Sequence, residues 1–235
     1  MFGEQAVSNI ILMLLCYGYV LVIIAVSGRM PETLNVSQKT SRKFLHAMIG
    51  NLLFVIPFFT SNIYPVLVAA PFILVTFLAS PYSPIKNRER LRGLADLTEK
   101  GHPLGLVFYA ISYTLLAFFF ASQPYVIAAG ILPMAYGDSM ASLVGEKYGK
   151  SRYSIMAKKT LQGSLAMLCA SLLSLIVGLA FFSSIYSFSA SAMILRAIPV
   201  VIIVTLAESI SPKGFDNLTV PILGALTFWL LIGRI

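Results

Sequence analysis

The chain has 235 residues, of which 58% are hydrophobic and 11% are charged. Soluble domains carry about 25% charged residues, so this composition excludes an ordinary soluble protein and predicts a membrane protein. The net charge of +8 would favour nucleic acid in a soluble chain. Here the basic residues stand between apolar segments, so anionic headgroups or phosphates are the expected partners and nucleic acid is not.

Eight apolar segments follow one another along the chain, each about long enough to span a bilayer as a helix. In chain order they lie near residues 7–28, 43–60, 63–80, 104–121, 124–144, 161–183, 189–210 and 217–234. The fifth contains Pro133 and Gly137, where we expect a broken helix; a count of seven spans is the alternative. We therefore predict an all-α, polytopic transmembrane helix bundle that forms one domain over residues 1–235, without a separate soluble domain. No basic residue precedes the first span, so we expect a retained helix and not a cleaved signal peptide.

The basic residues predict which way the bundle faces. Fifteen of the 17 fall in alternate connections, near 29–43, 81–103, 145–160 and 211–216, and the connections between these carry no charge. The positive-inside rule places the basic connections in the cytoplasm and both termini outside. The membrane would be the cell membrane of a prokaryote, or the endoplasmic reticulum or an organelle membrane of a eukaryote.

Residues 137–151, GDSMASLVGEKYGKS, look like a phosphate-binding Walker loop, but the spacing is wrong. That loop has four residues between its first glycine and the Gly-Lys pair and follows a strand, whereas Gly145 and Gly149 enclose three residues after an apolar segment. Asp138, Ala141, Gly145 and Gly149 recur at helical spacing, which predicts a face of small residues ending in one carboxylate. Close helix packing is an equally good explanation of the glycines.

Acidic side chains stand near the predicted cytoplasmic ends of three spans: Asp138, Glu208 and Asp216. Carboxylates inside or beside a membrane are costly and indicate function. Each could instead only pair with a nearby Lys or Arg. Asp216 or Asn217 could also simply cap the last helix, after a turn at 212–214.

The connection at 145–160 carries five cations and leads into a helix expected to start near Thr160. Its notable residues are Lys147, Lys150, Arg152, Lys158, Lys159, Thr160 and Gly163. Such a set suits a polyphosphate, because the first backbone N–H groups of a helix attract anions. A basic loop that only fixes the topology is the alternative.

The predicted start of the second span combines basic residues with a histidine. Arg42 and His46 are four residues apart and share a helix face, and Lys43 lies between them. An Arg–Lys pair is ordinary at a cytoplasmic boundary, and a membrane histidine commonly makes a helix–helix hydrogen bond. His102, before a proline, is expected in a loop.

Four blocks in this order, SRKFLHAMIGN, GDSMASLVGEKYGKSRY, KKTLQGS and ESISPKGFDNLTVP, resemble the CTP-dependent lipid-alcohol kinases. That family includes dolichol, phytol and farnesol kinases and a diacylglycerol kinase that uses CTP; the phosphatidate cytidylyltransferases are more distantly similar. The likeness covers about residues 38–222. The third block of the family usually reads Lys-Lys-Ser/Thr-x-Glu-Gly, and Gln162 replaces the Glu here, so no carboxylate role is expected at this position.

The resemblance implies phosphoryl transfer from CTP to a membrane lipid alcohol (a polyprenol, dolichol, geranylgeraniol, phytol or diacylglycerol) on the cytoplasmic side, with Mg²⁺. It makes Asp138 and Asp216 the candidate Mg²⁺ ligands, and Glu208 or His46 the group that orients or deprotonates the lipid hydroxyl. The residues expected to bind CTP and its phosphates are Arg42, Lys43, Gly145, Gly149, Lys150, Lys158, Lys159, Thr160, Gly163 and Asn217.

Three other functions are weighed against this one. A cytidylyltransferase would use the same site, but a lipid phosphate would attack the α-phosphorus of CTP and release pyrophosphate. A small transporter would place acids near the middle of the bilayer and show an internal repeat, and the sequence has neither feature. A non-catalytic scaffold would leave the clusters of basic residues unexplained.

Overall fold

A computed structural model describes residues 2–85, 94, 103–156, 158–212 and 214–233 of the chain. Within these residues each of the eight predicted spans is helical, which confirms the all-α bundle. Most of the basic connection at 81–103, with His102, and also Lys213 lie outside the described residues. The chain divides into two compact units, Met1–Ser122 and Gln123–Ile235, which are described separately below. The expectation of one domain over the whole chain stays a prediction.

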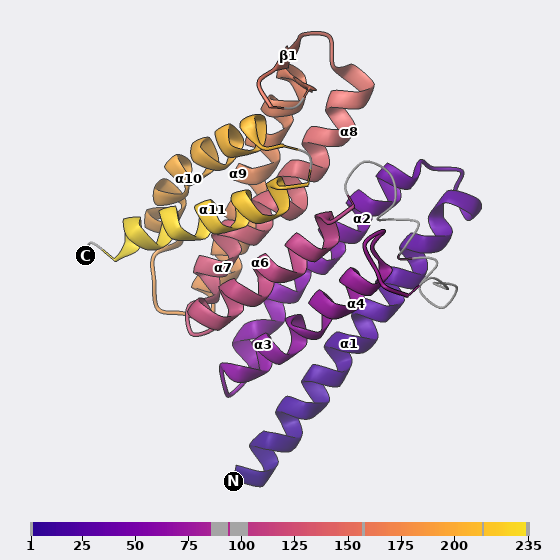
Figure 1. The fold of residues 1–235 in the computed structure, drawn as a ribbon. Coiled ribbons are helices and arrows are strands. Elements are labelled where there is room, and N and C mark those ends of the chain that lie inside the picture. The colour runs from indigo at the N-terminus through magenta and orange to yellow at the C-terminus, as the bar shows by residue number, and fades with distance from the viewer. Residues whose placement is uncertain (1, 86–93, 95–102, 157, 213, 234–235) are drawn as a thin grey trace. The chain divides into compact units, whose positions relative to one another are not determined.

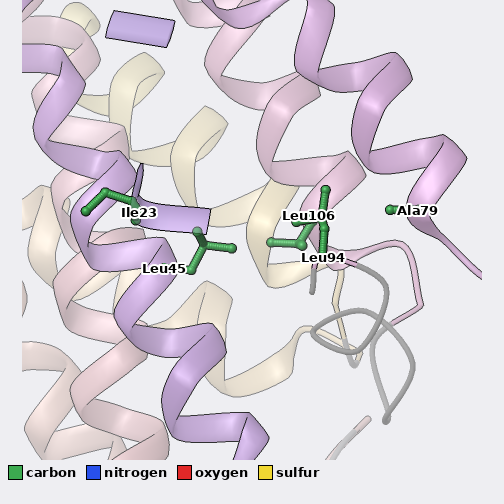
Figure 2. Close-up of a cluster of buried hydrophobic side chains, with 5 residues drawn as sticks. All are labelled: Ile23, Leu45, Ala79, Leu94 and Leu106. Carbon is green, nitrogen blue, oxygen red and sulfur yellow. The ribbon is translucent and has the colours of Figure 1, made fainter. Parts of the chain in front are cut away.

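The first unit is a set of helices around a small apolar core. Its elements are α1 (Phe2–Thr33), α2 (Gln38–Gly50), the 3₁₀ helix η1 (Asn51–Phe58), α3 (Ile63–Ala69), α4 (Pro71–Ala79) and α6 (Gly105–Phe120) (Figure 1). α1 packs against α2 and α3, and α6 packs against α3 and α4. Figure 2 shows one cluster of this core, formed by Ile23, Leu45, Ala79, Leu94 and Leu106.

Two spans of this unit differ from their predicted form. The second was expected to begin at residue 43, which is wrong: α2 begins at Gln38, because the Ser37 hydroxyl caps it by accepting the N–H of Thr40 at 3.1 Å. Arg42 therefore lies in the second turn of the helix and not at its start. The third span is divided into α3 and α4, since Pro71 has no N–H to continue the helical ladder.

The second unit is built around a central helix. Its elements are α7 (Pro124–Leu132), the π-helical η3 (Pro133–Asp138), α8 (Ser139–Tyr148), β1 (Arg152–Ser154), β2 (Lys158–Thr160), α9 (Leu161–Ser183), α10 (Ala190–Ile210) and α11 (Asp216–Ile232) (Figure 1). Every residue of α7 except Tyr125 is buried, because α9 and α11 both pack against it. A helix covered on all sides can be apolar all round, as this one is. A broken helix was expected near Pro133, which is wrong: the helix continues through η3 into α8, with a π-helical segment at this place.

The outer surface of both units suits a lipid environment. Four helices are long and apolar enough to cross a bilayer, judged by length and composition over the described residues: Glu4–Thr33, Pro124–Tyr148, Leu161–Ser183 and Ala190–Ile210. Large apolar side chains on α1, such as Leu14, Leu15 and Val22, are exposed. Apolar surface of this extent requires a non-aqueous neighbour, and the chain is therefore a polytopic membrane protein.

Candidate functional site

Three buried carboxylates of the second unit surround one lysine. Asp138 ends η3, Glu208 lies in the last turn of α10 and Asp216 begins α11; their exposed fractions are 3%, 3% and 5%. The ammonium of Lys159 donates a hydrogen bond to the Glu208 carboxylate, and its Nζ lies 3.9 Å from Oδ2 of Asp216. The structure thus brings together acids and a base that are far apart in the sequence.

The charge of Lys159 is set by these neighbours. Burial by itself would lower the pKa of this ammonium, because the charged form loses water. The carboxylate of Glu208, followed by those of Asp138 and Asp216, favours the charged form more strongly, so the pKa of Lys159 lies above its ordinary value. Lys159 is therefore a fixed positive charge at neutral pH.

A short hairpin presents this lysine to the acids. The connection was expected to be a loop, but β1 and β2 pair in antiparallel fashion, with Tyr153 opposite Lys159. Successive side chains of a strand point to opposite faces, which explains why Lys158 is exposed while Lys159 is partly buried. Figure 1 shows the hairpin beyond the ends of α8 and α9.

The helix that follows begins where the sequence predicts. Thr160 is the N-cap of α9, and its hydroxyl accepts the N–H of Gly163 at 3.1 Å. The N–H of Leu161 donates to the carbonyl of Ser151 at 2.9 Å. These two N–H groups are engaged within the protein, and anion binding by the remaining first N–H groups of the helix stays a prediction.

The side chain of Gln162 binds the two residues that precede the hairpin. Its side-chain oxygen accepts the backbone N–H groups of Lys150 and Ser151, at 3.1 and 3.3 Å. The Tyr153 hydroxyl and the Ser164 hydroxyl lie 2.5 Å apart and join the strand to the same first turns of α9. No role was predicted for Gln162, and its place in the Lys-Lys-Thr block was the available signal.

The small residues of α8 pack against α9. A Cβ on Gly163 would lie 2.9 Å from the carbonyl oxygen of Ala141, and one on Gly145 would lie 2.8 Å from the Thr160 hydroxyl. Gly149 is the C-cap of α8 and no longer part of the helix face predicted for it. The geometry supports the packing explanation, and a phosphate-binding role of these glycines stays a prediction.

The last helix begins directly at two of the predicted residues. α11 starts at Asp216, with Phe215 in the cap position, so the predicted side-chain cap is absent there. The Asp216 carboxylate instead accepts the N–H of its neighbour Asn217 at 3.0 Å, and both residues are buried. The turn before them is as expected: Phe215 donates to the carbonyl of Pro212, and Gly214 has a φ of 88°, which favours glycine.

The remaining candidates lie in the first unit, on α2. Arg42, Lys43 and His46 are all buried. The ring of His46 stacks on that of Tyr109, with centroids 4.9 Å apart, and the Tyr109 hydroxyl donates to the backbone carbonyl of His46 at 3.0 Å. These contacts tie α2 to α6 and fix the position of the histidine.

The acids can be tested against the needs of a metal ion. Among the residues that the structure describes, no three His, Cys, Asp or Glu side chains lie close enough together to share one. Mg²⁺ in phosphate-transferring sites typically takes one or two carboxylates and completes its shell with phosphate oxygens and water. The predicted pair of Asp138 and Asp216 fits that pattern, and their role as metal ligands stays a prediction.

The comparisons with known proteins agree with the resemblance drawn from the four blocks. No family model matches the chain, and no solved structure matches it significantly. It is 40% identical over 145 residues to the phytol kinase of Synechocystis sp., and these residues make up 60% of either chain. It is 31% identical to probable phytol kinase 2 of Oryza sativa subsp. japonica, over 81% of this chain and 67% of that protein.

A third relative, the chloroplastic farnesol kinase of Arabidopsis thaliana, is 29% identical over 83% of this chain and 66% of its own length. The matched part thus spans 60% to 67% of the length of these relatives. On this extent of likeness, the chain belongs to the polyprenol/phytol kinase family.

Proposed function

We propose that the chain transfers the γ-phosphoryl group of CTP to the hydroxyl of a membrane lipid alcohol, on the cytoplasmic side of the membrane. The observation that carries the proposal is the group of buried acids around Lys159, beside a hairpin with further exposed cations. Its relatives are named phytol kinase and farnesol kinase, which favours an isoprenoid alcohol as the acceptor.

The basic side chains would bind the phosphates. Lys150, Arg152 and Lys158 are exposed along the hairpin and would attract a polyphosphate from water. Lys159 is held in place by Glu208 and offers a charge that need not be repositioned. Arg42 and Lys43, on α2 of the first unit, are the further cations that the family resemblance assigns to phosphate binding.

The acids would need a cation when a nucleotide is bound. A carboxylate 4 Å from a phosphate charge costs about 4 kcal/mol at an effective dielectric constant near 20. Asp138 and Asp216 would hold a Mg²⁺ ion, which supplies neutralisation of the charge on the phosphates. Lys159 contributes one positive charge against three carboxylates, so the charge balance of this group favours a further cation.

The transfer itself moves one proton and one phosphoryl group. The lipid oxygen forms a bond to the γ-phosphorus, the bond from that phosphorus to the bridging oxygen breaks, and CDP leaves. The hydroxyl proton passes to a base, for which Glu208 and His46 are the candidates. Glu208 already accepts a hydrogen bond from Lys159, which would hold its carboxylate in a fixed orientation for that step.

The proposal is tested with purified protein, a panel of lipid alcohols and CTP labelled at either the α- or the γ-phosphate. Label from the γ-position alone should appear in the lipid product, and CTP should support turnover far better than ATP. Transfer of the α-label to a lipid phosphate would show a cytidylyltransferase instead. Equal rates with ATP would overturn the choice of donor.

A further inference from the structure

The first unit contains an apolar groove that the proposed reaction has not yet used. Its volume is about 590 Å³, counted with its open side, and its walls come from α1, α2, η1, α3, α4, α6 and Leu94. Sites for small molecules have mostly apolar and aromatic walls, and the walls of this groove are of that kind. The lining includes Val20, Leu45, Ile49, Val68, Phe72 and Leu106.

Three polar side chains interrupt this lining, and two of them are satisfied. The Thr76 hydroxyl donates to the carbonyl of Phe72 at 2.6 Å, and the Tyr109 hydroxyl donates to that of His46. The Tyr113 hydroxyl is buried and makes no hydrogen bond to any other residue that the structure describes. A buried hydroxyl without a partner is unfavourable, so the Tyr113 O–H retains a hydrogen bond that a bound molecule could accept.

The groove is apolar throughout, and a cationic side chain lies beyond one end of it. Leu45 and Ile49 line the groove, and Arg42 stands one turn before Leu45 on the same face of α2. Leu106 belongs to one buried cluster with Leu45, so it lies at this end of the groove (Figure 2). Tyr113 is seven residues further along α6, about 10 Å deeper at the rise of an α-helix. Tyr109 lies between the two and contacts both the groove and the ring of His46.

We propose that this groove holds the tail of the lipid alcohol, with the hydroxyl end beside α2 and the chain running past Tyr109 towards Tyr113. The inference rests on the proposed function, since it names the substrate class and places its tail. A single apolar chain with one polar end matches an apolar groove that has a cationic side chain, Arg42, beyond one end. The double bonds of an unsaturated isoprenoid tail, such as that of geranylgeraniol, offer a π-face to the Tyr113 O–H, whereas a saturated tail leaves that hydroxyl unpaired.

The first test locates the tail without any turnover. Wild-type protein in phospholipid nanodiscs is irradiated with geranylgeraniol that carries a diazirine in its tail, in the absence of CTP, and the labelled residues are read by mass spectrometry. Label is expected on the groove residues of α3, α4 and α6. Excess geranylgeraniol should remove it, and excess phospholipid should not. Label confined to the exposed face of α1, or equal competition by phospholipid, would overturn the groove assignment.

The second test fills the groove. Ala110 lines it, whereas Ala25 is exposed on α1 and does not. Ala110→Phe should reduce specific labelling about tenfold, and Ala25→Phe should leave it unchanged; thermal unfolding of each variant reports whether it is folded. A folded Ala110→Phe protein that labels like the wild type would contradict the proposal.

The third test concerns Tyr113. Unlabelled geranylgeraniol should reduce photolabelling at a lower concentration than its fully hydrogenated analogue does. Tyr113→Phe should remove that difference. A preference that survives in Tyr113→Phe would overturn the assigned contact.

The groove and the kinase proposal can fail separately. Phosphorylation of geranylgeraniol by a protein whose groove is never labelled would overturn the groove alone. A labelled groove in a protein that transfers no phosphoryl group from CTP or ATP would overturn the kinase proposal and leave a binding site for isoprenoid alcohols.

Discussion

The ammonium of Lys159 and the carboxylate of Glu208 form a hydrogen-bonded ion pair, although they come from a hairpin and from a helix end 49 positions later in the chain. Glu208 is buried, and the pair joins β2 to α10. Removing one partner of a buried pair leaves the other charge without its compensation. This contact is therefore expected to matter for folding as well as for phosphate binding.

Lys159→Met should lower the free energy of unfolding by about 3 kcal/mol for that reason. The folded-state pKa of Lys159 is above its ordinary value of 10.5, so its contribution is full below pH 10.5 and is lost as the pH rises through the raised pKa. Thermal unfolding between pH 7 and 11 should show a constant gap to the wild type that closes only at the alkaline end. The exposed neighbour provides the control: Lys158→Met should change stability by less than about 0.5 kcal/mol.

Asp138→Asn tests the metal proposal. If Asp138 is a ligand of Mg²⁺, turnover should fall by about 100-fold, which corresponds to about 2.7 kcal/mol of lost transition-state stabilisation. Raised Mg²⁺ should restore part of it, and the melting temperature should stay close to that of the wild type. Glu146→Gln, at an exposed acid of the same helix, is the matched control. An active Asp138→Asn enzyme with unchanged Mg²⁺ dependence would end the proposal; the same assay on Asp216→Asn shows whether both acids serve one site.

Gln162 can be changed towards and away from the family pattern. Gln162→Leu removes the acceptor of two backbone N–H groups and should destabilise the hairpin by about 1–3 kcal/mol. Gln162→Glu keeps the acceptor and makes both hydrogen bonds charge-assisted, which are roughly twice as strong. Hydrogen exchange at the amides of Lys150 and Ser151 should therefore be fastest in the Leu variant and slowest in the Glu variant. The reverse order would contradict this role.

Gly163→Ala separates packing from phosphate binding. The new methyl group would lie 2.9 Å from the carbonyl oxygen of Ala141, so we expect a loss of about 1–3 kcal/mol of stability. The KM for CTP should change little if packing is the main role. Gly18→Ala in α1 is the matched control, because nothing lies within 4 Å of a Cβ there; it should be neutral or gain up to about 1 kcal/mol. A Gly163→Ala protein of full stability and greatly raised KM would favour the phosphate role instead.

The orientation of the chain can be tested by labelling. With Cys16 and Cys169 replaced by alanine, single cysteines at the exposed positions Lys39 and Arg152 should react with an impermeant reagent only after the membrane is opened. A cysteine at Ser122, in an uncharged connection, should react in intact cells. Reaction of Lys39→Cys or Arg152→Cys from outside would reverse the proposed topology.

The helices could be predicted from the sequence because a long apolar run is a signal that each segment carries by itself. The irregular helix at Pro133 and the N-cap of α9 at Thr160 were equally local, since proline and an N-cap act on their own neighbours. The hairpin was missed because strands of three residues are too short for an alternating pattern to show.

Contacts between distant segments could not be predicted in the same way. That Lys159 rather than Lys158 meets Glu208 depends on the register of β1 and β2, and nothing in the sequence fixes that register. The role of Gln162 depends on the path of the chain after α8. The groove in the first unit depends on how six elements pack, and no single segment of the sequence contains it.

The wide turns of η3 rotate the two parts of one long helix relative to each other about the helix axis. An α-helix advances by 3.6 residues per turn, so an extra residue in a turn rotates everything after it by about 100°. The part before η3 packs against both α9 and α11, and the part after it packs against α9. Deleting one residue from Pro133–Asp138 should restore a plain α-helix at that place and shorten the path to the carboxylate of Asp138, so the direction in which that acid points is encoded by the length of the segment as much as by its residues.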